Sequence, residues 1–518
     1  MNRPSVPGTD TSIATHPVAE KDSKGSFRNI LKSSALIGAS SVINVGVGAL
    51  RTKALAVLLG PAGIGLMGAF SMILDLARNC AELGLTSSGV RQIAEAASSD
   101  DERRLSVTAL VLRRATLLCG LLGAIVLWAS SGAVSRLTFG NEEQATSISL
   151  LSFALFLSVV AGGQGALLQG TRKMKALASV SVYGALLGTT ASVSIIYFAR
   201  ERGIVPSLLA GAIASLVLSS WFASNVRTVK VVLQAGEVNR EAALLFKLGL
   251  AFLASGLLTT GATFAIRTFV IRTLGLEAAG VYQAAWTLGG LYVGFVLQAL
   301  GMDFYPRLVG VAHDHHACNA TVNEQTQASL LMAAPGILAT ITFAPLVVAL
   351  FYSAKFLGAV ALLRWFCLGM ALRVITWPMG FIIVAKNQQM AFFAVEAAWA
   401  TFNVAATWWG LRVFGLEGAG IAFMLSYVFH ALIVYPMVRS MTGFRWSGEN
   451  LRTGSTFLLA GTALLATQRV LPPWPALAFG ACLTLASLWY CVRTLARLST
   501  AKGSLPAIRR FLRFGRPR

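Results

Sequence analysis

The chain has 518 residues, of which 55% are hydrophobic and only 12% charged, and its mean hydropathy is +0.68. Soluble globular domains carry about 25% charged residues, so this composition argues against a soluble enzyme. The net charge of +22 is better explained by a membrane surface than by nucleic acid, because most Lys and Arg residues lie in short loops between apolar runs.

Apolar runs of about 20 residues recur along the chain, and each is long enough to cross a bilayer as a helix. They predict fourteen membrane-spanning helices. The predicted helices cover residues 33–58, 64–90, 107–132, 146–168, 176–198, 205–225, 248–273, 279–305, 329–352, 358–385, 389–413, 419–438, 453–470 and 474–492. With the N-terminus in the cytoplasm, basic residues concentrate in the inside loops, which predicts a multi-pass inner-membrane protein with both termini cytoplasmic.

Both ends of the chain are polar. Residues 1–30 are expected to form a disordered cytoplasmic segment without a cleavable signal peptide. Residues 496–518 are expected to form a basic cytoplasmic tail that rests on anionic lipid.

A repeated turn organises the chain. Arg51-Thr52 precedes the turn Gly60–Gly65, and Arg267-Thr268 precedes the turn Gly275–Gly280 at nearly the same distance. A third turn of this kind spans Gly415–Gly420. Glycine-rich turns alone recur in tight helical hairpins, but the shared Arg-Thr pair favours an internal repeat. Because both copies start on the same side of the membrane, the repeat is parallel.

The repeat predicts an all-α polytopic membrane protein with two pseudo-symmetric six-helix lobes around a central cavity, plus a C-terminal helix pair. The first lobe is assigned to residues 31–232, the second to 241–442 and the appended pair to 453–495. Opening of the cavity would be gated at the first two turns.

Two arginines occupy equivalent depths in the two lobes. Arg51 and Arg267 each lie roughly 10 Å from the middle of their helices, which suggests a cationic site facing the shared cavity. The alternative is that each arginine snorkels to the outer interface, as is expected for Lys53. Since the planar guanidinium suits phosphate oxygens, such a site would select an anionic ligand such as a lipid pyrophosphate.

The second predicted helix carries Asp75, Arg78 and Glu82 on one face. These residues either form a self-neutralising ladder, or Asp75 or Glu82 carries a proton or sodium ion during transport. Further ionisable groups lie in later helices: Arg272 and Asp303 near helix ends, and Arg364, Arg373, Glu396 and His430 within helices. His430 by itself is expected to be a hydrogen-bonded core histidine.

No motif indicates catalysis or a bound cofactor. The six cysteines are scattered, the cluster His313–His316 is expected to be a solvated loop rather than a metal site, and no Walker motif supports ATP hydrolysis. The chain is therefore expected to be a transporter and not an enzyme, with a proton or sodium gradient as the energy source to be tested.

The segments Ser33–Gly38, Leu50–Ala56, Leu59–Gly65 and Gly84–Ala94 resemble the N-terminal pattern of bacterial O-antigen translocases. These are Wzx-type flippases, in the superfamily that also contains the MATE exporters and the peptidoglycan-lipid flippase. The resemblance implies two six-helix lobes that move an undecaprenyl-pyrophosphate-linked oligosaccharide from the cytoplasmic to the outer leaflet by alternating access.

The resemblance also implies roles for particular residues. In the peptidoglycan-lipid branch, cavity arginines on the first and seventh helices matter, and Arg51 and Arg267 would take those roles here. Arg78 and Arg373 are further candidates. The implied partners are the lipid-linked substrate, membrane lipids, a polysaccharide polymerase and a chain-length regulator, with no nucleic acid.

Two other functions remain open from the sequence. A cation-coupled multidrug exporter would prefer a carboxylate-rich, aromatic cavity. A membrane glycosyltransferase or polymerase of the same pathway would need a long outside loop with catalytic residues, and the longest one here, around 133–145, is short.

Overall fold

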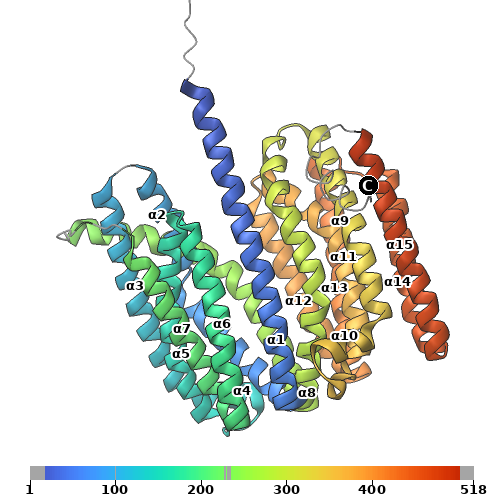
Figure 1. Cartoon of the computed structure of the whole chain (residues 1–518), viewed down its shortest axis with the longest axis horizontal. Helices are drawn as coiled ribbons and strands as arrows, with labels where there is room; N and C mark the ends of the chain where they lie inside the picture. The colour runs from blue at the N-terminus through green and yellow to red at the C-terminus, as the bar shows by residue number, and fades with distance from the viewer. Residues whose placement is uncertain (1–17, 100, 227–228, 230–234, 502–518) are drawn as a thin grey trace, which may run out of the picture.

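The computed structural model describes residues 18–99, 101–226, 229 and 235–501, and these residues form helices joined by short turns, with no strand among them (Figure 1). The helices are α1 (Val18–Glu82), α2 (Leu85–Ser98), α3 (Glu102–Ala129), α4 (Ser131–Phe139), α5 (Ala145–Gly170), α6 (Met174–Ala199), η1 (Arg200–Gly203), α7 (Ile204–Ser224), α8 (Ala235–Gly310), α9 (His315–Thr342), α10 (Ala344–Phe351), η2 (Ala354–Phe356), α11 (Ala359–Ala385), α12 (Gln389–Phe414), α13 (Glu417–Thr442), α14 (Gly448–Val470) and α15 (Pro473–Ala501).

The two longest helices, α1 and α8, each contain one non-helical residue. Gly60 has φ 67° and ψ −173°, and Gly275 has φ 84° and ψ 177°. Glycine adopts positive φ without the steric cost of a Cβ atom, so each helix can turn back at this residue. Gly415, with φ 58°, joins α12 to α13 in the same way. The structure thus confirms the repeated turn predicted from the sequence.

Nine helices of the described chain are long and apolar enough to cross a membrane, or ten if the bent pair α9–α10 is counted as one span. Three of these segments hold two helices in series: α1, α8 and the α6–α7 segment. The remaining predicted span is α14, which is long enough but carries Glu449, Arg452 and Arg469. With α1 and α8 each counted as two helices and α9–α10 as one, each of the fourteen predicted spans has a counterpart among the described helices.

Several predicted boundaries were wrong. The span predicted over 329–352 begins at His315, because the Asp314 side chain caps its first turn, and it bends by 84° after Thr342. The span predicted over 64–90 ends at Glu82, and Gly84, with φ 71°, starts the separate helix α2.

The ends of the chain also differ from the prediction. Helix α1 starts at Val18, inside the segment predicted to be disordered, because an existing helix extends more easily than it nucleates and the Ala-Glu-Lys run favours it. Residues 1–17 of that segment and 502–518 of the predicted tail lie outside the described residues.

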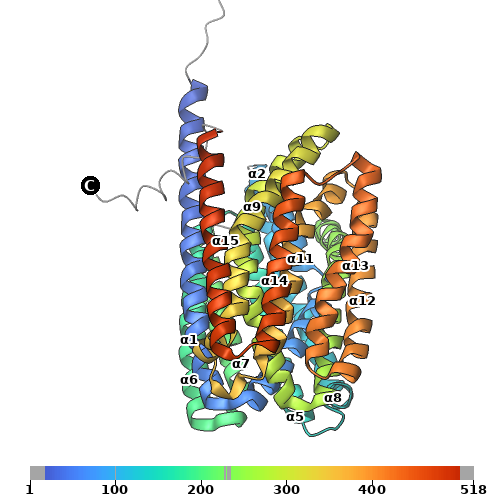
Figure 2. The same ribbon diagram turned by 90° about the vertical axis from the view of Figure 1, so that its right-hand side faces the viewer.

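The helices form two groups. We call α1–α7 the first lobe and α8–α13 the second lobe; α14 and α15 lie at the far edge of the second lobe (Figures 1 and 2). We call the end that carries Gly60, Gly275, α4 and α10 the kink end, and the opposite end, where α1 begins, the terminal end. Buried residues of both lobes, such as Phe70, Val270 and Phe366, share one hydrophobic core.

The lobes touch backbone to backbone where the two kinked helices cross. A Cβ atom added at Gly65 would overlap the Leu276 carbonyl oxygen, and one added at Gly280 would overlap the Pro61 carbonyl oxygen. The two contacts mirror each other, as a two-fold relation between the repeats requires. Small residues allow such close helix approach in membrane proteins.

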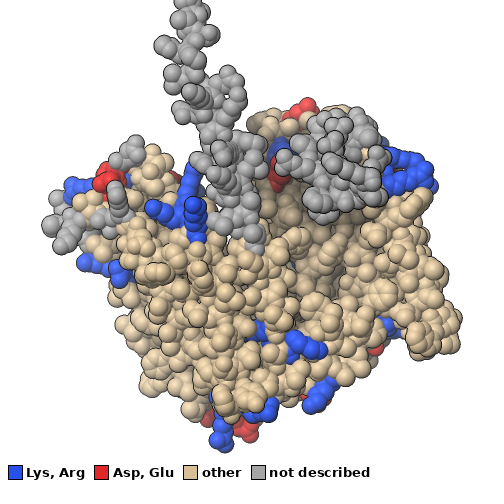
Figure 3. Space-filling view, in the orientation of Figure 1, with Lys and Arg blue, Asp and Glu red and all other residues tan. Residues whose placement is uncertain are grey.

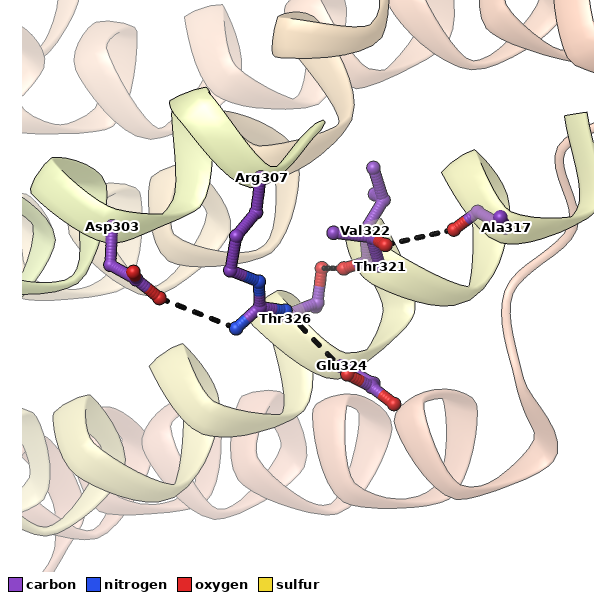
Figure 4. Close-up of polar contacts among 7 residues, drawn as sticks. All are labelled: Asp303, Arg307, Ala317, Thr321, Val322, Glu324 and Thr326. Atoms are coloured by element: carbon purple, nitrogen blue, oxygen red, sulfur yellow. Dashed lines mark hydrogen bonds and ion pairs between the residues drawn. The ribbon is translucent and has the colours of Figure 1, made fainter. Parts of the chain in front are cut away.

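Charged residues lie mainly toward the two ends of the helices, and the broad band between them is largely uncharged (Figure 3). At the terminal end, the last turns of α8 are tied to α9: Arg307 Nη1 lies 3.3 Å from Asp303 Oδ2, and Arg307 Nη2 lies 3.6 Å from Glu324 Oε2 (Figure 4). Asp303 therefore belongs to an ion-pair cluster near a helix end, where it was predicted to lie.

Helix α14 is bonded to the second lobe at both of its ends. At its start, Asn450 Nδ2 donates to the Asn323 carbonyl oxygen of α9 at 2.8 Å. Near its other end, Arg364 Nη2 of α11 donates to Gln468 Oε1 at 2.8 Å, and Arg469 pairs with Glu417 of α13. These contacts fasten the appended pair to the second lobe.

Candidate functional site

Arg51 and Arg267 are the repeat-related arginines of α1 and α8. In both residues the Nε atom is buried and has no hydrogen-bond partner among the described residues. An unpaired buried donor is costly, so these two atoms are suited to a ligand that supplies acceptor oxygens. Burial of both Nε atoms also argues against the alternative that the two side chains simply snorkel to the interface.

One carboxylate and two phenols act on Arg267. Arg267 lies within electrostatic range of the Asp75 carboxylate of α1 and of the phenols of Tyr282 and Tyr352. Asp75 is exposed and forms no hydrogen bond or ion pair with the described part of the chain. Asp75 therefore offsets part of the charge of Arg267, and a site shared by Arg267 and Arg51 stays a prediction.

Arg78 and Glu82 form a closed pair. Arg78 Nε lies 2.6 Å from Glu82 Oε1, and the Thr86 hydroxyl donates to Glu82 Oε2 at 2.9 Å. A Cβ atom at Gly162 would lie 3.0 Å from Glu82 Oε1, so α5 packs tightly over the pair. The predicted ladder thus forms as an ion pair between Arg78 and Glu82. Asp75 lies within electrostatic range of Arg78 and Arg267 without an ion pair to either.

Basic side chains cross between the lobes at the kink end. Lys53 of α1 donates to the Ala349 carbonyl oxygen of α10 at 2.6 Å, and Arg272 of α8 donates to the Arg136 carbonyl oxygen of α4 at 2.7 Å. Each cation meets the last turn of a short helix in the other lobe, where the helix dipole favours positive charge. Lys53, expected to snorkel, is instead held by α10.

Arg373 lies elsewhere, in a cavity inside the second lobe. This cavity of about 450 Å³ is enclosed by α8, α11, α12 and α13. Its lining combines an arginine, a glutamate and a histidine with eight aromatic side chains: Arg373, Glu396, His430, Tyr282, Trp286, Trp377, Phe381, Phe392, Trp399, Phe423 and Tyr427. We call it the aromatic cavity. Of the four arginines proposed from the sequence, Arg373 alone is among the described residues that line this cavity.

Two polar side chains of the aromatic cavity have unused hydrogen-bonding atoms. Asn403 is 6% exposed and His430 is 8% exposed, and neither Asn403 Oδ1 nor His430 Nδ1 has a partner among the described residues. His430 Nε2 lies 3.8 Å from Glu396 Oε1. His430 is buried as predicted, but it faces a cavity and its side chain forms no hydrogen bond with the described residues, so the expectation of a hydrogen-bonded core histidine was wrong.

The sequence carried a signal for this cavity that its interpretation missed. Phe392, Glu396, Trp399, Asn403 and Thr407 all line it from α12. Their spacing of three and four residues places them on one helix face, which forms a polar and aromatic stripe within an otherwise apolar helix.

A second cavity of about 580 Å³ lies in the first lobe, between α3, α5 and α7. Arg113 is the one charged side chain among the described residues that line it, and Gln164 and several serines supply the other polar groups. None of these described lining residues is aromatic. The two cavities therefore differ in chemistry although they lie in related lobes.

No group of three or more His, Cys, Asp or Glu side chains in the described part of the chain could hold a metal ion. In the cluster His313–His316, the Asp314 carboxylate instead accepts hydrogen bonds from the backbone N–H groups of His316 and Ala317, at 2.8 and 3.1 Å.

Comparison with known families adds to this geometry. Residues 54–361, more than half of the chain, match the family described as polysaccharide biosynthesis protein. The chain belongs to this family. It is also 24% identical over 415 residues to the lipid III flippase of Escherichia coli strain K12, a match that covers 77% of this chain and 96% of that protein.

Solved structures show the same fold. The lipid II flippase MurJ in an inward closed conformation aligns with a TM-score of 0.66 at 13% identity, over 89% of this chain and all of that one. An inward-facing multidrug resistance MATE transporter of the MOP superfamily aligns with a TM-score of 0.63 at 16% identity, over 78% and 98% of the two chains. The predicted resemblance is confirmed, and this polysaccharide biosynthesis protein is a multi-pass membrane protein with the MOP-superfamily fold.

Proposed function

We propose that this protein is a flippase that moves an undecaprenyl-pyrophosphate-linked oligosaccharide, an O-antigen unit or a related surface polysaccharide unit, from the cytoplasmic to the outer leaflet of the inner membrane. The observation that carries this proposal is the pair of buried, unpartnered Nε atoms of Arg51 and Arg267. The lipid III flippase named above, and the family, support a substrate of this class.

The pyrophosphate would accept hydrogen bonds from both guanidinium groups. Arginine binds such oxygens through planar, charge-assisted hydrogen bonds, and the contact strengthens where water is excluded. Since Asp75 lies within electrostatic range of Arg267, an arriving pyrophosphate would compete with Asp75 for the charge of Arg267. Asp75 is therefore our candidate for coupling to a proton or sodium gradient, while Glu82 is occupied by Arg78.

Alternating access would move the lobes about their crossing at Gly65 and Gly280. The basic inside loops support cytoplasmic termini, so the kink end would face outward. The lobe boundaries at 31–232 and 241–442, with the appended pair at 453–495, stay predictions, as do a polymerase and a chain-length regulator as partners.

Complementation tests the proposal. The wild type should restore surface polysaccharide in cells that lack their own O-unit flippase, whereas Arg51→Ala and Arg267→Ala should reduce it at least about tenfold at matched expression, because each removes charge-assisted hydrogen bonds. Arg202→Ala is the control, since Arg202 is an exposed arginine of η1. If both variants complement like the wild type, the arginine site is wrong.

A cation-coupled drug exporter is the second candidate. The aromatic cavity with Glu396 favours it, because cationic drugs bind aromatic faces and carboxylates, but Arg373 in the same cavity opposes a cation. Expression should then raise resistance to ethidium, and a Glu396→Gln variant should lose that resistance. Unchanged resistance in the expressing cells would exclude this function.

A further inference from the structure

We propose that the aromatic cavity of the second lobe binds the sugar that is attached directly to the pyrophosphate, and so supplies the glycan contact of the transport site. This inference rests on the proposed flippase function and deepens it by assigning a binding subsite for the carbohydrate.

The rings of the aromatic cavity provide stacking surfaces. The Tyr282 and Trp286 rings are nearly parallel, at an interplanar angle of 7° and a centroid distance of 6.4 Å, and Trp399 lies 5.4 Å from the Tyr427 ring. A sugar ring presents C–H groups on its faces and hydroxyl groups around its edge. Aromatic side chains can pack against those faces, while Tyr and Trp keep a polar group available.

The unused polar atoms match the edge of such a ring. Asn403 Oδ1 and His430 Nδ1 are buried, line the cavity and have no partner among the described residues. Buried polar atoms are normally hydrogen-bonded, so these two atoms indicate a ligand that brings its own donors. Sugar hydroxyls can donate to both, whereas a lipid tail can donate to neither.

The charges of the cavity favour a hydroxyl-rich ligand over an ion. Arg373 and Glu396 carry opposite charges, and His430 lies beside Glu396. Tyr282 and Tyr427 are the other ionisable groups that line the cavity. A hydrophobic cation would need a net negative cavity and a free phosphate a net positive one, whereas hydroxyl groups can bond to groups of either sign.

The position of the cavity fits the covalent structure of the proposed substrate. Ile266, directly before Arg267 on α8, lines the cavity, and Tyr282, which also lines it, lies within electrostatic range of Arg267. A pyrophosphate bound at Arg267 would therefore present its first sugar to the aromatic cavity. The first-lobe cavity, between α3, α5 and α7, has no aromatic residue among its described lining residues and is not suited to stacking.

Equilibrium binding to the full-length protein in lipid nanodiscs tests the inference. Three radiolabelled probes are compared: undecaprenyl pyrophosphate, the same lipid carrying glucose, and the same lipid carrying N-acetylglucosamine. We expect at least one sugar-bearing probe to bind wild type about tenfold more tightly than the bare lipid, because stacking and two or more hydrogen bonds are added.

Variants of residues that line the aromatic cavity test whether this extra affinity for sugar arises there. Asn403→Leu, which is similar in size, and Trp399→Leu should remove the preference for sugar while leaving the affinity for bare undecaprenyl pyrophosphate unchanged, which also shows that the variants fold. Trp408→Leu is the matched control, because Trp408 lies on the same helix but is 42% exposed in an apolar groove next to α8. It should keep the full preference.

The outcomes separate this inference from the proposed function. If the wild type binds the bare lipid but sugar adds no affinity, or if the Asn403 and Trp399 variants keep the preference, the aromatic cavity is not the sugar subsite and only this inference fails. If Arg267→Ala leaves the affinity for bare lipid unchanged, the pyrophosphate site fails while a sugar preference would still support the cavity. If no probe binds, both fail.

Discussion

The two lobes share a backbone plan but differ in the side chains around their cavities. Both have a glycine kink, a short helix at the kink end (α4 or α10) and a helix capped by an aspartate (Asp101 or Asp314). The first-lobe cavity, however, is lined by serines and aliphatic residues with Arg113, whereas the second-lobe cavity is lined by aromatic residues with Arg373, Glu396 and His430. The repeat thus preserves the elements that hold the lobes together and leaves ligand chemistry free to differ.

The largest expected effect concerns the shared plan. Gly65→Ala and Gly280→Ala should each destabilise the protein by about 1–3 kcal/mol or more and abolish transport, because the added Cβ overlaps the backbone of the other lobe. Thermal unfolding in detergent, followed by size-exclusion fluorescence, measures this. Gly294→Ala is the control, since a Cβ there meets nothing within 4 Å. A large effect at only one of the two glycines would show that the two contacts at the crossing are not equivalent.

The second prediction sharpens the difference between the cavities. Arg373→Gln should reduce surface polysaccharide in complemented cells at least about tenfold, because it removes a charged hydrogen-bonding group from the cavity that we assign to substrate. Arg113→Gln, the matched change in the first lobe, should reduce it less than about twofold. Equal losses would show that both cavities serve transport.

The third prediction concerns the reciprocal contacts at the kink end. Lys53→Met and Arg272→Met each remove a cation from the last turn of a short helix, which should weaken closure by about 0.3–1 kcal/mol per contact. The double variant should therefore populate the kink-end-open state more. Distances between spin labels at the exposed positions Leu137 and Leu346, in a background without native cysteines, measure that population. An unchanged distance distribution would mean that the glycine crossing alone holds this end.

The smallest expected effect lies at the helix caps. Backbone N–H groups of Ala317 and His316 hold the pKa of the Asp314 carboxyl below its usual range. Because the pKa is lower in the folded state, the cap stabilises the protein above the unfolded pKa of about 3.9 and the contribution is lost as pH falls through the folded pKa. Asp314→Ala should thus slightly lower the melting temperature at pH 7, and the decrease should shrink as the pH falls below about 3.9.

The equivalent cap supplies the comparison for that measurement. Asp101 accepts a hydrogen bond from the Arg104 backbone N–H at 3.0 Å, and Asp101→Ala should give a similarly small decrease at pH 7. A decrease confined to one lobe would show that the shared caps no longer contribute equally.

Features that depend on local sequence could be predicted. Helix positions followed from apolar length, and the kinks followed from glycines that alone tolerate the required φ at Gly60 and Gly275. The repeat also identified Arg51 and Arg267 as equivalent residues, and in both the Nε atom is buried. The bend after Thr342 was missed although Pro345, in the first turn of α10, marks a helix boundary there.

Features that depend on contacts between distant helices could not be predicted. Lys53 and Arg272 bond to backbone carbonyl groups, which leave no signature in the side chains of their partners. The aromatic cavity needs residues from four helices, so the stripe on α12 alone did not reveal that Trp399 and Asn403 face Tyr282 and Arg373. The cavity exists only once these four helices are packed together.

The attachment of α14 at both ends has a mechanical consequence. Because Asn450 holds one end and Gln468 and Arg469 hold the other, the appended helices must travel with the second lobe as one rigid body. The first lobe and this larger body then displace unequal amounts of lipid when they move. The smaller first lobe would swing through the bilayer, while the larger body serves as the anchored side of the hinge.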